Sequence, residues 1–521
     1  MRFATIIILF LSVISSGFAQ SSVTLKQADQ LRGGVKDGER FDRVLGNVIF
    51  VQGRTTIYCD SALFYRSRNA VEAFGRVRIT DGDSVTITSN RAEYDGNTRV
   101  AKLRNNVVFR KLATATLYTN FLDFDRIKNE AFYFNGGRLV DSINVLTSRK
   151  GYYEVNSNMA SFKSNVNVVN PDYTMKSDSL QYNSRTKIIY FRTETTVVDK
   201  ENNTFVYQGG EYDTNVKQSN LKQGQAESQS YTLTGRKLIL DDRTRIYRVQ
   251  GNVVMTHKEE KLVIYGQDAV FNKQKNIAKV FTNTFLTKVT DEGDTLFMTA
   301  DTLVSIDSDD PAKKRLLAYK NVKVFKSDMQ GIADSVEYRQ ADSTMFFYGS
   351  PVLWTDGNQM TADSISMMIE NNTISRIFLN TNAFVISMDT IKNFNQIKGR
   401  KMTAFFRNKQ LHQVVVQGNG ESIYFALEDK TNLLMGMNKI LCSNITIRFK
   451  DSQVNNLSFY VKPEADFIPP HELKKDDMLL KGFSWRVDLR PEKEDVVKPT
   501  DSAEPATKPL PPISLPQRGR L

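Results

Sequence analysis

The chain has 521 residues and a formal net charge of +12, from 70 Lys and Arg against 58 Asp and Glu. This length exceeds one small hydrophobic core, so composition alone predicts two to four domains or an array of repeats. Three scattered histidines (His257, His412 and His471) and two separate cysteines cannot make a Cys/His zinc site, and they give a His-dependent nucleophile triad little to draw on. We therefore expect no metal, no cofactor, no catalytic residue and no nucleic-acid partner.

The amino terminus has the pattern of a secretory signal peptide. Arg2 gives a positive start, residues 4–14 are apolar, and Gly17 and Ala19 occupy the −3 and −1 positions of a cleavage site before Gln20. The apolar run is shorter than a transmembrane helix, and no other stretch approaches ~20 apolar residues. The sequence predicts that residues 1–19 are removed and that the mature protein is exported and soluble.

A repeat of about thirty residues runs through most of the chain. Each unit has a polar anchor residue, and consecutive anchors are spaced by 28 to 43 residues. The thirteen anchors are Asp60, Asn90, Asn120, Arg149, Asp178, Gln208, Arg236, Gln267, Asp301, Asp334, Asp363, Arg400 and Ser443. Such a period predicts stacked supersecondary units that bury a continuous core.

The positions around each anchor alternate with a change of phase. The position three before the anchor is apolar with the exception of Gly331, and the position one before is small with the exception of Tyr207. Apolar residues resume two positions after the anchor, and aromatic residues dominate four positions after it. Because a strand alternates faces with period two, this phase change predicts a bulge or bend at the anchor. We expect the anchors to adopt the unusual backbone angles of the bend, with their polar heads outside, so that the sheet folds like a V.

The connections and the prolines favour an all-β array. Hairpin loops rich in Gly, Asn and Lys join the strands, as in residues 95–99, and no helical period is evident between residues 41 and 460. Of 13 prolines, only Pro171, Pro311 and Pro351 precede residue 460. We expect an elongated antiparallel array of about thirteen units.

The chain is predicted to divide into seven segments. These are a signal peptide (1–19), an amino-terminal flank (20–40), a first module (41–213), a polar connection (214–230), a second module (231–462), a terminal cap (463–490) and a disordered Pro-rich tail (491–521). Whether the array is one module or two abutted modules stays open. Cys59 and Cys442 are twelve units apart, too far for a disulfide, so both are expected to be free thiols buried at the bend.

Several repeats resemble a known family. Gly46-Asn47-Val48 and residues 299–303, 332–338 and 361–365 are similar to the OstA/LptA family of periplasmic lipopolysaccharide-transport proteins, and the resemblance extends over residues 41–460. It implies a V-shaped β-jellyroll whose interior holds the acyl chains of lipopolysaccharide. It further implies a periplasmic location, associated with the outer membrane. The implied partners are lipopolysaccharide, other jellyroll proteins of the transport bridge and the outer-membrane translocon, joined by edge-strand pairing, with end-to-end self-association as a further option.

The resemblance gives the interior columns a role in lipid binding. The expected lipid-contacting residues are Ile57, Phe64, Ile87, Tyr94, Leu117, Leu122, Phe124, Tyr153, Met175, Leu180, Tyr182, Leu238, Ile264 and Phe271. Two alternatives remain: a ligand-free structural or surface array with a solid core, and a solenoid that binds or cleaves polysaccharide through Asp301, Asp334 and Asp363. The anchor column holds Asn, Gln, Arg or Ser elsewhere, which favours a bend position over an active site.

Overall fold

In the computed structural model, two compact units divide the chain, residues 1–201 (unit 1) and residues 202–521 (unit 2). The structure describes residues 22–82, 85–111, 115–141, 143–228, 230–290, 293–355, 357–370, 373–428, 431–450 and 453–497. The predicted signal peptide and most of the predicted tail, residues 498–521, lie outside the described residues.

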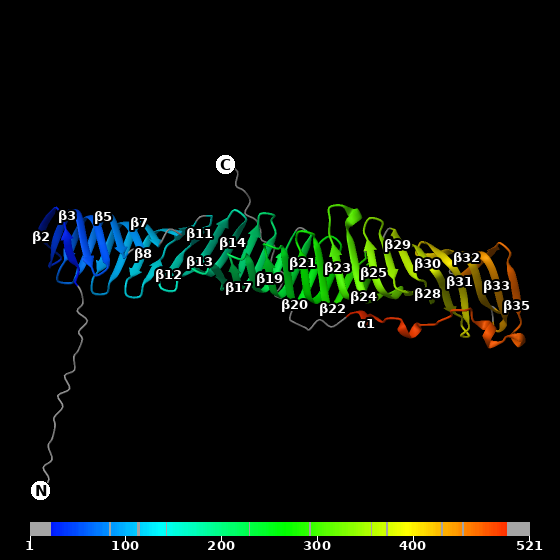
Figure 1. Ribbon diagram of the computed structural model, residues 1–521. Helices are drawn as coiled ribbons and strands as arrows, with labels where there is room; N and C mark the ends of the chain where they lie inside the picture. Colours follow the sequence, from blue (N-terminus) through cyan, green and yellow to red (C-terminus); the bar gives the residue numbers. More distant parts are fainter. Residues whose placement is uncertain are drawn as a thin grey trace, which may run out of the picture. The chain divides into compact units, whose positions relative to one another are not determined.

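Unit 1 is built from antiparallel strands that pair mainly with their neighbours in sequence, and Figure 1 shows them side by side from blue to cyan. The strands are β1 (Thr24–Gln27), β2 (Gln30–Lys36), β3 (Glu39–Gln52), β4 (Thr55–Tyr65), β5 (Ala70–Asp81), β6 (Val85–Asp95), β7 (Val100–Lys111), β8 (Ala115–Asp125), β9 (Glu130–Tyr133), β10 (Gly137–Val140), β11 (Val145–Ser148), β12 (Lys150–Glu154), β13 (Met159–Asn170), β14 (Tyr173–Asn183), β15 (Ile188–Phe191) and β16 (Thr195–Asp199).

Unit 2 continues the same pattern, with a few short helical turns, so the predicted all-β class is confirmed. Its strands are β17 (Thr204–Asp213), β18 (Gln218–Glu227), β19 (Tyr231–Asp241), β20 (Ile246–His257), β21 (Leu262–Asn272), β22 (Ile277–Val289), β23 (Thr295–Ile306), β24 (Arg315–Lys326), β25 (Met329–Arg339), β26 (Thr344–Tyr348), β27 (Val352–Thr355), β28 (Asn358–Thr361), β29 (Ser364–Glu370), β30 (Thr373–Met388), β31 (Phe394–Arg407), β32 (Gln410–Leu427), β33 (Leu434–Lys450), β34 (Gln453–Tyr460) and β35 (Glu464–Ile468). Its helical pieces are η2 (Pro311–Lys313), η3 (Pro470–Glu472), η4 (Lys475–Met478), η5 (Val487–Leu489) and α1 (Lys493–Val496).

The sheet is folded along a line of bulges, as the phase change predicts. Phe50 of β3 pairs with Ile57 of β4, and Phe64 lies seven residues further along β4. In a flat sheet those seven residues would span about 23 Å. The ring centroids of Phe50 and Phe64 are only 5.2 Å apart, so the two ends of the hairpin face each other.

We name the parts of this fold as follows. In each strand that contains an anchor, the segment before the anchor belongs to half-sheet B and the segment after it belongs to half-sheet A. The segments of neighbouring strands belong to the half-sheet with which they pair. The line of bulges between the two half-sheets is the crease. Hairpins at the far ends of both half-sheets border the mouth.

The backbone at the crease corrects one sequence prediction. The anchors were expected to adopt unusual backbone angles, but the positive φ values fall on residue pairs of the neighbouring strand, such as Gly46 (76°) with Asn47 (45°). That strand contains the extra residue of each bulge, because residues 45 and 48 of β3 pair with residues 61 and 59 of β4. The anchor side chain instead holds the corner from outside: the Asn321 amide donates to both carboxylate oxygens of Asp301, at 3.2 and 3.1 Å.

Small residues before the anchors are required by packing at the crease. A Cβ on Gly235 would lie 2.2 Å from Cγ1 of Val249, and a Cβ on Gly399 would lie 2.3 Å from Cγ1 of Val416. Valine side chains from the adjoining strand thus occupy the space inside the bend. This explains physically why the position before the anchor is small.

The two cysteines are free, as predicted, but only one is fully buried. Cys59 is buried at the crease of unit 1, whereas Cys442 is half-buried in unit 2. Burial raises the pKa of the Cys59 thiol to about 12.

Two predicted segments have more structure than the sequence indicated. Residues 214–230 were predicted to be a polar connection, yet they contain β18, which pairs with both β17 and β19. Alternating polar residues there had the composition of a linker, but backbone pairing needs no apolar side chain. The predicted cap, residues 463–490, begins with β35, which pairs with β33, and its remainder then passes back over unit 2.

Candidate functional site

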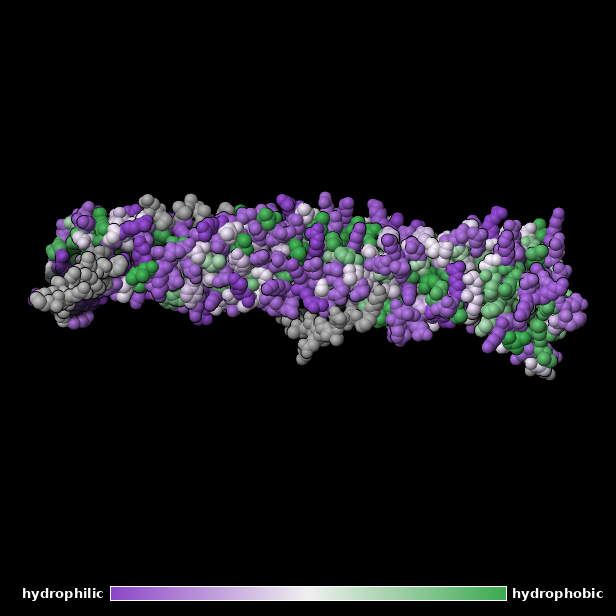
Figure 2. Space-filling view, turned by 60° about the horizontal axis from the view of Figure 1, so that its bottom comes forward, coloured by the Kyte–Doolittle hydropathy of each residue, from purple (hydrophilic) through white to green (hydrophobic). Residues whose placement is uncertain are grey.

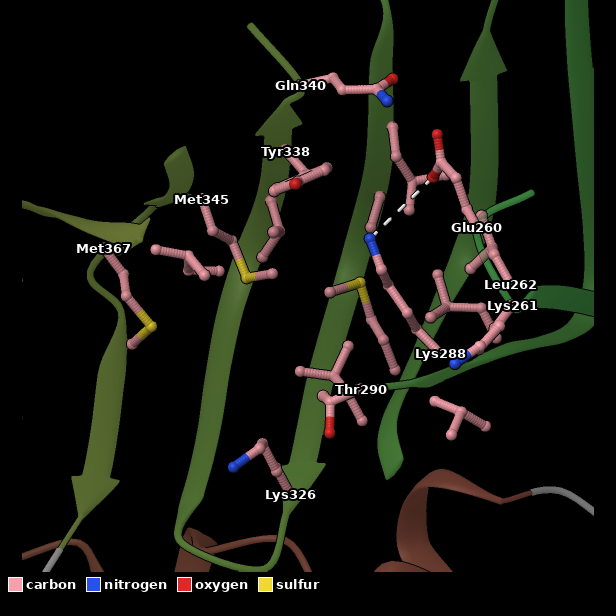
Figure 3. A pocket seen from close by; sticks show the side chains of 18 of the residues that line it. Glu260, Lys261, Leu262, Lys288, Thr290, Lys326, Tyr338, Gln340, Met345 and Met367 are labelled. Atoms are coloured by element: carbon pink, nitrogen blue, oxygen red, sulfur yellow. Dashed lines mark ion pairs between the residues drawn. The ribbon is translucent and has the colours of Figure 1, made fainter. Parts of the chain in front are cut away.

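Unit 2 contains a cavity of about 380 Å³ between its half-sheets, and Figure 3 shows it from close by. Its lining comes from both half-sheets. Met298 on β23 precedes the anchor Asp301 and belongs to half-sheet B, whereas Val336 on β25 follows the anchor Asp334 and belongs to half-sheet A. The apolar lining residues are Leu262, Leu286, Val289, Leu296, Met298, Ile306, Leu316, Ala318, Met329, Val336, Met345, Met367, Ile369, Ile374 and Phe406. The strand alternation that builds the core therefore also gives this cavity an apolar wall.

Methionines make the apolar wall adaptable. Met298, Met329, Met345 and Met367 all line the cavity, and Met345 and Met367 lie on neighbouring strands in Figure 3. Methionine is unbranched and polarizable, so its side chain adjusts to irregular apolar surfaces. This wall can accommodate flexible hydrocarbon better than a wall of branched side chains.

The cavity mouth carries charged side chains. Lys288 is two residues beyond the buried Leu286 on β22, so strand alternation turns it into the same interior. Its Nζ lies 4.0 Å from the carboxylate of Glu260, the ion pair drawn in Figure 3, and 5.0 Å from the ring centroid of Tyr338. Because Tyr338 belongs to half-sheet A and Lys288 to half-sheet B, this cation–π contact spans the mouth.

A second lysine lies at the same border. Nζ of Lys326 is 2.7 Å from Asp328 and 3.3 Å from Asp294. Burial opposes its charge, but the hydrogen bonds and charges of Asp328 and then Asp294 together raise the pKa of Lys326 above its ordinary value. The ammonium group is therefore charged at neutral pH. In all, six Lys and Arg against four Asp and Glu line the cavity, which leaves an excess of positive charge.

Tyr231 and His257 contribute an aromatic part of the lining. Their rings meet edge to face with centroids 4.9 Å apart. Burial raises the pKa of Tyr231 to about 12, so the phenol stays neutral at physiological pH. Nδ1 of His257 accepts a hydrogen bond from the backbone N–H of Glu260 at 3.1 Å, which fixes the ring.

The mouth of unit 1 is bridged by polar contacts between facing hairpins. The buried Gln52 amide donates to the carbonyl of Gly96 at 2.8 Å, and Arg126 pairs with Asp81 at 2.7 Å. Lys111 donates to a carbonyl of the facing hairpin at 2.8 Å. These contacts hold the two half-sheets of unit 1 together.

The residues predicted to contact lipid lie in the packed interior, and the described lining of the cavity contains none of the fourteen. Eleven are buried: Ile57, Phe64, Ile87, Tyr94, Leu117, Leu122, Phe124, Met175, Leu180, Leu238 and Ile264. Tyr153, Tyr182 and Phe271 are half-buried. The cavity uses the same interior columns in later repeats, with Met298, Val336 and Met367 as examples.

The charged mouth residues were missed by the sequence reasoning. A signal for them exists: Lys288 and Lys326 continue the inward alternation two positions after the buried Leu286 and Val324. An inward position occupied by lysine at a strand end places a charge at the border of the interior.

Over the described ranges, no three His, Cys, Asp or Glu side chains gather as they would around a metal ion. Within the same part of the chain, no helix has the length and hydropathy needed to cross a membrane.

Comparisons with known proteins identify the amino-terminal part. Residues 20–178 match the family model described as OstA-like protein. This region is similar to the OstA-like family. The matched residues begin before the range predicted for the family resemblance, residues 41–460, and end within that range. The repeated strands, by contrast, continue to the end of that range. No curated protein matches the chain.

One solved structure is similar to part of this chain. The crystal structure of LptH from Pseudomonas aeruginosa, the LptA homologous periplasmic component of the conserved lipopolysaccharide transport device, is 14% identical. The match covers 22% of this chain and 80% of that chain, with a TM-score of 0.20.

Proposed function

We propose that this protein binds lipopolysaccharide in the periplasm and takes part in its transport to the outer membrane. The observation that carries the proposal is the cavity of unit 2, which combines an apolar wall with lysines at its mouth. The OstA-like match of residues 20–178 supports the same class of cargo. In this proposal acyl chains enter the interior and the anionic headgroup stays at the mouth.

The apolar wall supplies the larger part of the binding free energy. Each buried methylene contributes roughly 0.8 kcal/mol, so a chain of a dozen carbons gains about 10 kcal/mol before the costs of association. The interior columns repeat along the array, with Leu122 and Leu180 as members in unit 1. We propose that these predicted residues separate around acyl chains during transport, which needs the half-sheets of unit 1 to part.

The lysines supply the selectivity for an anionic headgroup. A phosphate oxygen bound to an ammonium group makes a charge-assisted hydrogen bond, stronger than one between neutral groups. Lys288 and Lys326 lie at the border where a headgroup would emerge from the interior. Both ammonium groups now pair with carboxylates, so a phosphate would have to displace those carboxylates or bind the ammonium groups beside them.

Edge strands offer the contacts to other jellyroll proteins. β34 and β35 both pair with β33 at the carboxyl-terminal end of unit 2. Phe467 of β35 is 58% exposed and Leu441 of β33 is 42% exposed, and Figure 2 shows apolar side chains gathered at this end, on the right. We propose that this end joins the next jellyroll module, in the translocon, the transport bridge or a second copy, by edge pairing.

Site-specific photo-crosslinking in growing cells tests lipid binding. A photoreactive residue replaces Met298 or Met345 in the cavity, Phe124 in the unit 1 interior, or the outward Asp123 as control. We expect lipopolysaccharide adducts at both cavity positions, adducts at Phe124 if unit 1 opens, and none at Asp123. Absence of adducts from every interior position would favour the ligand-free structural array. A photoreactive residue at the anchor Asp334 tests the remaining alternative, because adducts to sugar polymer there would favour a polysaccharide-binding array.

A further inference from the structure

The carboxyl-terminal segment of unit 2 covers the outside of the fold. After β35 the chain turns at Pro469 and Pro470, and residues 473–497, here named the strap, run back along half-sheet B toward β23. Figure 1 shows this orange and red segment passing from β35 to α1 beneath the strands. Leu480 contacts β31, Arg486 contacts β28, and Asp495 lies 3.9 Å from Lys323 of β24.

Two glutamines bind the strap through its backbone. Gln396 has 0% exposure; its Oε1 accepts from the N–H of Leu480 at 2.8 Å and its Nε2 donates to the carbonyl of Met478 at 2.8 Å. Gln359, also 0% exposed, accepts from the N–H of Arg486 and donates to the carbonyl of Ser484, both at 2.7 Å. In both cases one amide binds residues i and i+2, as suits an extended peptide.

These glutamines lie on the outer surface of half-sheet B. Ile397 belongs to the column that faces the interior, so its neighbour Gln396 faces outward. The same alternation turns Gln359, which precedes Met360, outward. A glutamine on an outer surface is normally exposed, whereas both of these glutamines are buried and hydrogen-bonded to the strap.

An apolar cluster completes the strap site. Leu480 of the strap, with 4% exposure, packs with buried residues of the outer surface, and Phe483 and Trp485 pack against the same cluster. The buried residues of the sheet in this cluster are Phe384, Ile386, Ile423, Phe425 and Met437. Soluble monomers rarely expose a contiguous apolar face of this kind, so a cover stabilises it.

The strap resembles a bound ligand more than a part of the sheet. Among the described residues, none after Ile468 belongs to a strand, so removal of the strap would break no pair of the strand ladder. The fit is also incomplete: Trp354 pairs with both Gln330 and Gln359 in the sheet, yet its buried indole N–H has no hydrogen-bond partner.

We propose that the outer face of half-sheet B in unit 2 is a binding site for an extended apolar peptide, and that it accepts the strap of a second copy of this chain. An exchanged strap makes the same contacts as the resident one, so the exchange has little net cost. The apolar face is covered both before and after the exchange. The exposed turn around Pro470, between β35 and the strap, is the hinge. Two copies joined in this way would hold each other near their carboxyl-terminal ends.

Peptide binding to the full chain tests the site. Leu480→Asp with Trp485→Asp weakens the resident strap and leaves the sheet residues unchanged. We expect a fluorescent peptide of residues 473–497 to bind this variant saturably by anisotropy, and to bind the natural chain at least tenfold more weakly, because the tethered strap competes at an effective concentration of about millimolar. The same peptide carrying Leu480→Asp should not bind.

Matched substitutions and a second measurement complete the test. Adding Gln396→Met to the strap variant should weaken the peptide about tenfold, whereas Gln410→Met, at an exposed position of β32, should not. A variant that retains its strand circular dichroism but binds no peptide would overturn the proposal. Should the variant fail to fold, two differently tagged natural copies are incubated together at about millimolar concentration, where the strap of a second copy competes with the tethered strap, and are then chemically crosslinked. Co-purification of both tags that excess strap peptide abolishes supports exchange, and failure to co-purify overturns it.

Discussion

Single residues at the interior decide how closely the half-sheets pack, and Gly331 is the clearest case. It is the exception in an otherwise apolar column, because a Cβ there would lie 2.6 Å from Cδ2 of Leu353 on the paired strand. We expect Gly331→Leu to lower the free energy of unfolding by about 1–3 kcal/mol through overpacking. Urea denaturation measures the loss. Gly33→Ala, where no atom lies within 4 Å of the added Cβ, is the control and should change little; equal losses would refute the packing explanation.

The lysines at the cavity mouth are predicted to act on the headgroup alone. Lys288→Met keeps the length of the side chain and removes its charge, so affinity for a phosphorylated amphiphile should fall about tenfold, the equivalent of one charge-assisted hydrogen bond of about 1.5 kcal/mol. Affinity for an uncharged amphiphile of the same chain length should stay constant. Titration calorimetry of both ligands checks this, with Lys102→Met, exposed on β7, as control. A parallel loss for both ligands would mean that Lys288 shapes the wall instead.

The two thiols are predicted to differ in reactivity. Burial holds the pKa of Cys59 at about 12, so between about pH 8.5 and 12 its thiol is neutral in the folded chain and ionised in the unfolded chain. The unfolded state then binds fewer protons, and this group's contribution to stability is lost as pH rises through that window. At pH 8.5 iodoacetamide should label the half-buried Cys442 first and Cys59 only after unfolding in urea. Peptide mass spectrometry gives the order, and early labelling of Cys59 would contradict its burial.

Hairpins of unit 1 that face each other across the mouth are joined by an ion pair. Arg126 pairs with the buried Asp81, whereas Arg66, with 64% side-chain exposure, pairs with Asp42 at 2.6 Å in water. Arg126→Met leaves a buried carboxylate without its cation and should lower the free energy of unfolding by about 1–3 kcal/mol. Arg66→Met should cost less than about 1 kcal/mol. Denaturation of both variants measures the difference; equal losses would show that the mouth is as solvated as the surface.

Strand elements were largely predictable from the sequence, and contacts between distant elements were not. The alternation around Asp301 predicts both half-strands and the bend between them, because it depends on local backbone geometry. The position of the cavity depends on which side chains meet across the fold, such as Lys288 with Tyr338, and these are fifty residues apart. Likewise Gln396 gives no sign in sequence that Leu480, 84 positions later, will bury it.

At the scale of the whole molecule, an array of stacked strands should lose stability locally. Strands pack mainly on their neighbours, so a defect weakens the surrounding repeats first. Leu122→Ala on β8, at 0% exposure, should cost about 2–5 kcal/mol, and the equivalent Leu379→Ala on β30, at 1% exposure, places the same defect in unit 2.

Hydrogen exchange followed by mass spectrometry separates the two defects. The first variant should speed exchange in β7 to β9 and leave β31 to β33 unchanged, and the second should give the reverse. Two compact units are expected to open separately, because the amides that exchange together report one cooperative unit. If either substitution instead accelerated exchange equally in both units, the array would unfold as one body, and opening the unit 1 interior to lipid would require the strands around the unit 2 cavity to open with it.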